Sequence, residues 1–274
     1  MYPFAYLRPQ RLTDALALLQ QHPEAKALSG GMTLLPTLKQ RLRAPSHLVD
    51  LTRLPELQGI RFDGGLLHVG AAARHAAIAA SPVVRAQLPA LAELAGLIGD
   101  QQVRNRGTVG GSVANADPAA DHPAGLLGLG ATVVTDRRRI AADAMFVAMF
   151  ETALAPDEVV VAIEYPQPRR AAYAKQRHPA SGYAVAGVFI AQTGDGIRVA
   201  VTGAGPCAFR WTAAEQRLAA SDLNPAALDG LALDPAGLNV DLSATGAYRA
   251  SLVATLARRA LAAIQQAPED DHGI

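Results

Sequence analysis

The sequence predicts an α+β protein: two small α/β subdomains followed by a C-terminal antiparallel sheet with helices. Short apolar strands alternate with helical patterns over about the first 168 residues, which is typical of α/β units. Two similar glycine-pair segments lie about eighty residues apart within that region. A proline-flanked stretch then leads into alternating strands joined by a tight turn. We therefore predict subdomains at 1–53, 54–168 and 169–274.

Composition restricts the classes of function. Half of the 274 residues are hydrophobic and the formal net charge is +1, so the chain is expected to form a sizeable core and not to bind nucleic acid. Cys207 is the only cysteine, which excludes an intrachain disulfide framework and an iron–sulfur cluster held by this chain alone. No stretch is long and apolar enough to span a bilayer, so we expect a cytoplasmic protein.

The first subdomain is predicted from apolar periodicity. In order, we expect a strand at 4–7, a helix at 14–21, a strand at 25–28, a helix at 34–42 and a strand at 47–51. Thr13 is expected to cap the first helix, because its hydroxyl can accept a hydrogen bond from the first turn. The unit is too small to be stable alone and is expected to pack on the second subdomain.

The second and third subdomains are predicted in the same way. For the second we expect a hairpin at 60–69 around Gly64-Gly65, helices at 76–80 and 87–98, an apolar segment at 123–129, and strands at 131–135 and 158–164. The segment 165–170 is predicted to be the boundary. For the third we expect antiparallel strands at 171–176, 184–192 and 196–203 and helices at 211–220 and 248–266. The polar tail from Ala267 is expected to fray.

The segment from Thr108 to Asp121 carries the strongest chemical signal. Its paired glycines, Gly110 and Gly111, leave the backbone bare, and the hydroxyl groups of Thr108 and Ser112 flank them. A carboxylate at 117 and another at 121 follow at turn-forming positions. Bare backbone N–H groups suit a phosphate and carboxylates suit sugar hydroxyls, so the segment indicates a site for a phosphorylated nucleotide.

A second segment, Ser29 to Pro36, repeats this chemistry. Gly30 and Gly31 follow a predicted strand and precede a predicted helix, an arrangement that directs N–H groups toward an anion. The two segments can therefore bind one pyrophosphate from both sides. The alternative is two unrelated tight turns. The order of Gly125, Gly128 and Gly130 does not match a dinucleotide-binding G-x-G-x-x-G, and no G-x-x-x-x-G-K-[ST] is present.

Together these residues resemble a known family, the FAD-binding medium subunits of the molybdenum hydroxylases. That family carries A-G-G-x-[ST]-L-L-P and T-[IV]-G-G-N-x-A-x-A-D-P-A-x-D loops, and this chain has Ser29–Pro36 and Thr108–Asp121 at the corresponding places. Tyr173-Ala174-Lys175 and the segment 178–184 resemble the family's C-terminal segment. Ser112 replaces a frequent Asn and Ala73 a frequent Thr. The resemblance implies a PCMH-type FAD-binding fold.

The resemblance also implies which residues contact FAD. They are Leu28, Ser29, Gly30, Gly31, Met32, Thr33, Leu34, Ala71, Ala72, Thr108, Val109, Gly110, Gly111, Ser112, Ala114, Asp117, Asp121, Ile163, Lys175 and Tyr183. The two glycine loops would hold the pyrophosphate mainly through backbone N–H groups. Asp121 would accept hydrogen bonds from the adenosine part, with Asp117 as the competing choice. Ile163, Lys175 and Tyr183 would lie near the isoalloxazine, the alternatives being an exposed lysine and a core tyrosine.

The implied activity is electron transfer by a flavoprotein subunit with no catalytic acid, base or metal ligand of its own. Electrons would arrive from a small 2Fe-2S subunit, substrate would be hydroxylated in a large molybdenum-cofactor subunit, and the assembly would be a heterohexamer, a dimer of heterotrimers. FAD would pass the electrons to an external acceptor. The alternatives are a self-contained FAD-dependent oxidoreductase and a non-redox nucleotide-binding module.

Overall fold

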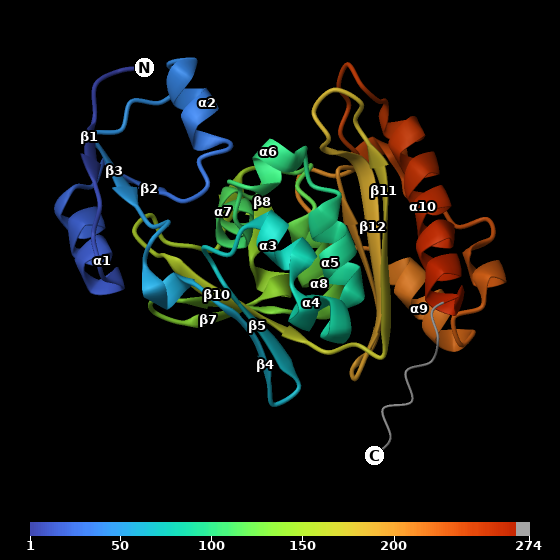
Figure 1. Cartoon of the computed structure of the whole chain (residues 1–274). Coiled ribbons are helices and arrows are strands. Elements are labelled where there is room, and N and C mark those ends of the chain that lie inside the picture. The colour runs from blue at the N-terminus through green and yellow to red at the C-terminus, as the bar shows by residue number, and fades with distance from the viewer. Residues whose placement is uncertain (267–274) are drawn as a thin grey trace.

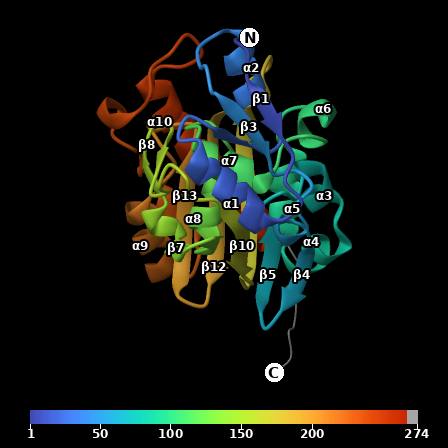
Figure 2. The same ribbon diagram turned by 90° about the vertical axis from the view of Figure 1, so that its left-hand side faces the viewer.

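The N-terminal part of the chain forms a three-stranded parallel sheet with two helices. The computed structural model describes residues 1–266, so the tail predicted to fray from Ala267 lies outside the described residues. The strands run in the order β1 (Ala5–Leu7), β3 (His47–Asp50) and β2 (Lys26–Leu28). The helices are α1 (Leu12–Gln21) and α2 (Leu34–Lys39). Figures 1 and 2 show α1 on the outside of this sheet, away from the rest of the chain.

The middle of the chain forms a five-stranded sheet covered by short helices. The strand order is β4 (Ile60–Asp63), β5 (Leu66–Gly70), β10 (Val160–Pro166), β6 (Thr132–Thr135) and β7 (Arg139–Ala141), with every neighbouring pair antiparallel. The helices are α3 (His75–Ala80), α4 (Pro82–Gln87), α5 (Pro89–Gly96), α6 (Gln101–Arg104), α7 (Val109–Asn115) and α8 (His122–Leu129). A small hairpin of β8 (Phe146–Ala148) and β9 (Glu151–Thr152) lies beside α7.

The C-terminal part forms a four-stranded antiparallel sheet backed by two helices. Its strands run in the order β11 (Arg170–Arg177), β12 (Ala184–Thr193), β13 (Gly196–Thr202) and β14 (Phe209–Arg210). The helices α9 (Thr212–Ala220) and α10 (Gly246–Gln266) lie on its outer face in Figure 1. Short 3-10 turns occur at Pro55–Leu57, Ala142–Ala144, Pro225–Leu228 and Pro235–Gly237.

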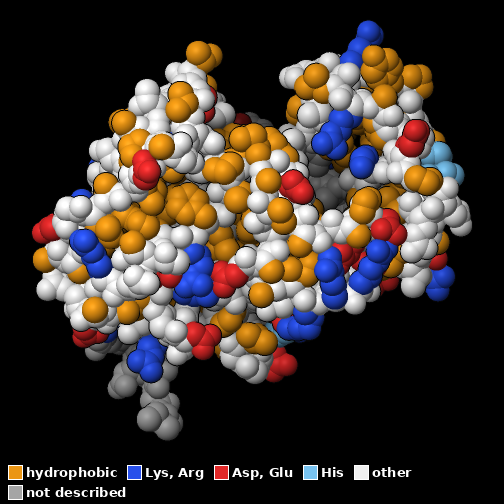
Figure 3. Space-filling model, turned by 180° about the vertical axis from the view of Figure 1, so that it is seen from behind, with side chains coloured by type: hydrophobic (Ala, Val, Ile, Leu, Met, Phe, Trp, Pro, Cys, Tyr) orange, Lys and Arg blue, Asp and Glu red, His pale blue; other side chains and the backbone are white. Residues whose placement is uncertain are grey.

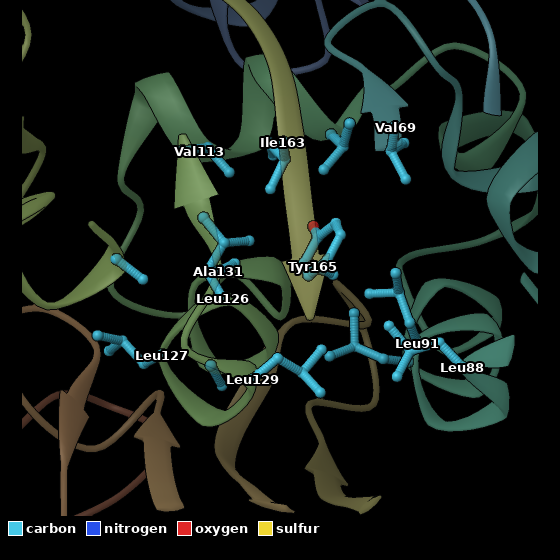
Figure 4. Close-up of a cluster of buried hydrophobic side chains, with 14 of the residues drawn as sticks. Val69, Leu88, Leu91, Val113, Leu126, Leu127, Leu129, Ala131, Ile163 and Tyr165 are labelled. Atoms are coloured by element: carbon cyan, nitrogen blue, oxygen red, sulfur yellow. The ribbon is translucent and has the colours of Figure 1, made fainter. Parts of the chain in front are cut away.

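Two hydrophobic cores share the C-terminal sheet. Side chains alternate along β12, so Phe189 packs toward α8 and the middle sheet, while Val188 and Ile190 pack toward α10. This double packing explains why nearly all of β12 is buried. The inner core also contains Ile163 and Tyr165 of β10. In Figure 4 Ile163 lies between Val113 and Val69, and Tyr165 lies on the side of the leucines of α5 and α8.

The predicted fold class is confirmed, and so are the glycine hairpin at 64–65 and the antiparallel third sheet. Several local predictions were wrong. The helix expected at 87–98 is shorter: α5 spans Pro89–Gly96, because Leu88 leaves the helical region (φ −151°) and separates it from α4, which ends at Gln87. The helix expected to reach 42 ends at Lys39, and Arg41 has a left-handed φ of 61°. Arg11, not Thr13, is the N-cap of α1.

The region predicted to be the boundary before the third sheet is shorter than expected. β10 continues through the buried Tyr165 to Pro166, and β11 begins at Arg170. Pro166 is tolerated because it is the last residue of β10, beyond the pairing with β6 that ends at Glu164. Only residues 167–169 connect them. The third sheet therefore joins the middle sheet closely, as their common hydrophobic core requires. Within residues 1–266, none of the helices has the length and apolar character needed to cross a membrane.

Candidate functional site

A cleft of about 620 Å³ separates the N-terminal sheet from the middle sheet. Figure 3 shows the molecule hollowed at this place, beside the N-terminal subdomain. The predicted site residues that line the cleft are Ser29, Gly30, Gly31, Met32, Thr33, Leu34, Ala71, Ala72, Thr108, Gly110, Gly111, Ser112, Ala114, Asp117, Asp121 and Tyr183. The structure thus brings the two glycine segments to one cavity, of a size that small-molecule sites commonly have.

The first glycine segment lies directly on the backbone of the second subdomain. A Cβ at Gly30 would overlap the carbonyl oxygen of Arg106 and lie 2.6 Å from Gly107 Cα, so only glycine permits this approach. Gly31 has a left-handed φ of 72°, which turns the chain into α2. The backbone N–H groups of Gly30, Gly31 and Met32 donate to no backbone or side-chain acceptor within residues 1–266. These three donors border the cleft and are available to an anion.

The second glycine segment is not the open loop that the sequence predicted. It forms α7, and the N–H groups of Val109 and Gly110 donate to Ala73 O (3.0 Å) and Ala71 O (2.9 Å). The expectation that both loops would bind a pyrophosphate through backbone N–H groups is therefore wrong for these two donors. A Cβ at Gly110 would lie 2.6 Å from that of Ala71, so the glycine serves close packing of α7 against the end of β5.

Two hydroxyl groups connect the glycine segments across the floor of the cleft. Ser29 Oγ and Thr108 Oγ1 lie 2.7 Å apart. Thr108 Oγ1 also accepts a hydrogen bond from Gly111 N at 3.2 Å and so caps α7. The side chain of Thr108 is buried, and this one oxygen stabilises both the helix start and the contact between subdomains.

Replacing Thr108 by valine will remove both hydrogen bonds at nearly constant volume. We expect the free energy of unfolding to fall by about 1–2 kcal/mol, since a helix cap and a buried partner are lost together. Urea denaturation of the flavin-free protein measures this. Thr108→Ser keeps the hydroxyl and should stay within about 0.5 kcal/mol of wild type. A valine variant as stable as the serine variant would contradict the assignment.

The two carboxylates have different environments. Asp117 Oδ1 accepts a hydrogen bond from Ala119 N at 2.9 Å, which fixes the turn after α7. Asp121 lies at the start of α8 with its side chain 3% exposed, where it accepts from Tyr173 Oη at 2.6 Å. Lys175 Nζ lies 2.8 Å from the same carboxylate. Burial raises the pKa of Asp121, while the Lys175 ammonium and the Tyr173 hydroxyl oppose that rise.

Four predicted site residues do not line the cleft: Leu28, Val109, Ile163 and Lys175. Ile163 is fully buried in the inner core (Figure 4). Lys175 is neither an exposed lysine nor directed into the cleft, because its side chain is 1% exposed and paired with Asp121. Tyr183 lines the cleft and is 40% exposed, so it is not a core tyrosine. Burial raises the pKa of Tyr183, the Asp117 carboxylate adds to this rise, and the Thr33 side chain partly opposes it.

The structure adds cleft residues that the sequence did not indicate. The β8–β9 hairpin places Phe150 at the cleft, where its N–H donates to Ala116 O at 3.2 Å. His75 also lines the cleft, and its Nδ1 lies 3.1 Å from Nε2 of the fully buried His122. Burial lowers the pKa of His75 to about 4, so this pair is neutral at physiological pH. Neither feature carries a local sequence signal, because the contacting residues are 34 and 47 positions apart.

The residues present fit a phosphorylated nucleotide cofactor. Backbone N–H donors border the cleft at Gly30–Met32, and the Asp121 carboxylate can accept from sugar or ribityl hydroxyls. The missing side chain at Gly111, together with Ala71 and Ala72, leaves the wall open for close approach. Within residues 1–266 no group of three or more His, Cys, Asp or Glu could hold a metal ion.

Comparison with known proteins gives a consistent picture. The family described as FAD binding domain in molybdopterin dehydrogenase matches residues 2–168. The carbon monoxide dehydrogenase medium chain of Hydrogenophaga pseudoflava is 37% identical, over 94% of this chain and 96% of that protein. The nicotine 6-hydroxylase medium subunit of Paenarthrobacter nicotinovorans is 34% identical, over 93% and 95%.

Solved structures match over the whole chain as well. A carbon monoxide dehydrogenase from H. pseudoflava that lacks the Mo-pyranopterin moiety of its cofactor contains a chain with a TM-score of 0.88 and 37% identity, covering 97% of this chain and 98% of that one. A chain of quinoline 2-oxidoreductase from Pseudomonas putida 86 matches with a TM-score of 0.87 and 29% identity, covering 97% and 98%. The likeness therefore includes the C-terminal sheet, beyond the range of the family match.

Proposed function

The chain belongs to the FAD-binding medium-subunit family of the molybdenum hydroxylases, and we propose that it transfers electrons within such a complex. It receives them from iron–sulfur clusters of a partner subunit and delivers them to an external acceptor. The observation that carries the proposal is the cleft, where three backbone donors at Gly30–Met32 and the carboxylate of Asp121 border one cavity. FAD supplies the redox chemistry there, because flavins exchange electrons in both one- and two-electron steps.

The residues of the chain bind and orient the cofactor in this proposal. The N–H groups of Gly30, Gly31 and Met32 donate to the pyrophosphate, and Asp121 accepts from hydroxyl groups. Tyr183, directly before β12, and Phe150, from the β8–β9 hairpin, shield the open side from water. None of these groups has to transfer a proton for electrons to pass through the flavin.

The proposal needs partner chains for its metal centres. Iron–sulfur clusters are commonly held by about four cysteines, and this chain has one. Relatives are named medium chain or medium subunit, which are names for one part of a larger assembly. We propose a small 2Fe-2S subunit and a large molybdenum-cofactor subunit as the partners, assembled as a dimer of heterotrimers.

The test begins with the isolated chain and continues with the complex. FAD is titrated into the flavin-free chain, and binding is followed by quenching of flavin fluorescence. The chain is then purified with its neighbours from its host and analysed for flavin, iron and molybdenum. Binding of FAD, together with partners that contain iron and molybdenum, supports the proposal.

Other outcomes select the alternatives. A chain that binds FAD but purifies alone, without iron or molybdenum, favours a self-contained FAD oxidoreductase. A chain that binds other nucleotides and not FAD favours a non-redox nucleotide-binding module, and the proposal is then wrong. Reduction of bound FAD by the reduced iron–sulfur partner, followed by stopped-flow absorbance, tests the direction of electron flow.

A further inference from the structure

The C-terminal sheet contributes a row of side chains to the second subdomain. Tyr173, Lys175 and Arg177 alternate along β11 and point to the same side. Tyr173 and Lys175 contact Asp121, Lys175 Nζ also donates to Leu97 O at 3.2 Å, and Arg177 donates to Gly99 O at 2.5 Å. β11 begins after the last residue of the family match, 168, so these contacts come from outside the matched FAD-binding domain.

The position of the Tyr173 hydroxyl depends on a glycine in the next strand. In the β11–β12 ladder Lys175 pairs with Gly187, and Tyr173 pairs with Phe189. A Cβ at Gly187 would overlap the Tyr173 hydroxyl and lie 3.0 Å from its Cζ. Because Gly187 has no side chain, there is space for the Tyr173 hydroxyl to reach Asp121. The Phe189 ring packs against the Tyr173 ring in a tilted arrangement, with the two centroids 6.1 Å apart.

The contacts leave part of the Asp121 carboxylate available. An ionised carboxylate has about four acceptor positions. Tyr173 Oη donates to Oδ1, and Lys175 Nζ lies 2.8 Å from both Oδ1 and Oδ2, so these donors occupy at most three of the positions. Asp121 borders the cleft, whereas Tyr173 and Lys175 do not. The two donors are therefore buried on the side of the carboxylate away from the cleft, and the remaining acceptor position can face a ligand.

We propose that Tyr173 is a positioning residue that holds the Asp121 carboxylate at the cleft wall as an acceptor for hydroxyl groups of bound FAD. The inference rests on the proposed function, since it assumes that FAD occupies the cleft. It assigns the C-terminal sheet a part in cofactor binding: without β11, Asp121 would lose both partners and its fixed direction.

The test is a double-mutant cycle of FAD affinity with Tyr173→Phe and Asp121→Asn. Tyr173→Phe removes one oxygen and keeps the ring. We expect FAD to bind about five- to twentyfold more weakly, which is less than the full contribution of a hydrogen bond to a charged group, because Lys175 still contacts the carboxylate. In the Asp121→Asn background, Tyr173→Phe should change FAD affinity by less than about twofold, since the carboxylate that Tyr173 positions is no longer present. Tyr248→Phe, at an exposed position on α10, is the matched control.

A pH profile separates positioning from a general loss of structure. The Tyr173 hydrogen bond favours the ionised carboxyl, so its removal should move the acid limb of FAD affinity to higher pH, while Tyr248→Phe leaves it in place. Gly187→Ala, which displaces the hydroxyl without deleting it, should weaken FAD binding in the same direction.

Each result has a defined meaning. If wild type binds FAD and Tyr173→Phe binds it equally well, the inference is wrong and the proposed function stands. If Tyr173→Phe weakens binding as much in the Asp121→Asn background as in wild type, Tyr173 does not act through Asp121 and the inference is again wrong. If wild type does not bind FAD, the proposed function itself fails, and that titration is performed first.

Discussion

Replacement of Lys175 by methionine is expected to lower the free energy of unfolding by about 3–5 kcal/mol, the cost of removing one partner of a buried ion pair. Lys175 and Asp121 are 1% and 3% exposed, so no water can replace the lost ammonium. Methionine keeps most of the volume, which restricts the effect to charge. Chemical denaturation of the flavin-free protein measures it.

Lys39→Met provides the matched control, because Lys39 is exposed at the end of α2. It should change stability by no more than about 0.5 kcal/mol. The double variant Lys175→Met, Asp121→Asn should recover part of the loss, since no unpaired charge then stays buried. A Lys175→Met variant as stable as the Lys39→Met control would refute the role of the ion pair.

The same variant should acquire a distinct dependence on pH. Burial already raises the pKa of Asp121, and loss of the cation removes the main opposing effect. The folded protein then retains a proton that the unfolded chain releases at about pH 4. Stability of Lys175→Met should therefore fall as pH rises above about 4, and its deficit relative to wild type should be smaller at pH 5 than at pH 8. An equal deficit at both values would contradict this.

Local sequence patterns predicted the sheets, the glycine turns and most of the cleft. Alternation in β11, β12 and β13 and the glycine pair at 64–65 depend on neighbours in sequence, and these predictions were confirmed. The sequence could not predict hydrogen-bond or ion-pair partners that lie far apart in the chain. Nothing near Gly110 indicates that its N–H donates to Ala71 O, so a helix with occupied donors was predicted to be an open phosphate loop.

The same limit applies to the charged residues of the site. Lys175 was predicted to lie near the flavin because its segment resembles the family's, but 54 residues separate it from the carboxylate that it neutralises. Its burial follows from how β11 packs on α5, which no periodicity within β11 specifies. Asp121 is different: its placement at the cleft follows from the segment Thr108–Asp121, whose chemistry is evident from neighbouring residues alone.

Gly30→Ala should have the largest effect on the cofactor. The new Cβ would overlap Arg106 O and lie 2.6 Å from Gly107 Cα, so the segment that carries the N–H groups of Gly30, Gly31 and Met32 must move away from the second subdomain. Overpacking of this kind costs about 1–3 kcal/mol, and we expect FAD to bind about ten- to a hundredfold more weakly. Equilibrium titration of FAD measures this, with thermal unfolding to confirm that the variant folds.

Gly194→Ala separates this steric effect from a general response to replacing glycine. Gly194 lies in the β12–β13 turn without a left-handed φ, and no atom lies within 4 Å of the place that an alanine methyl group would occupy. Its replacement should therefore leave FAD affinity unchanged within about twofold. If Gly30→Ala also binds FAD normally, the first glycine segment does not hold the pyrophosphate. The donors would then have to be sought elsewhere in the cleft, and α7 could supply few of them, because the N–H groups of Val109 and Gly110 are already bonded to the chain.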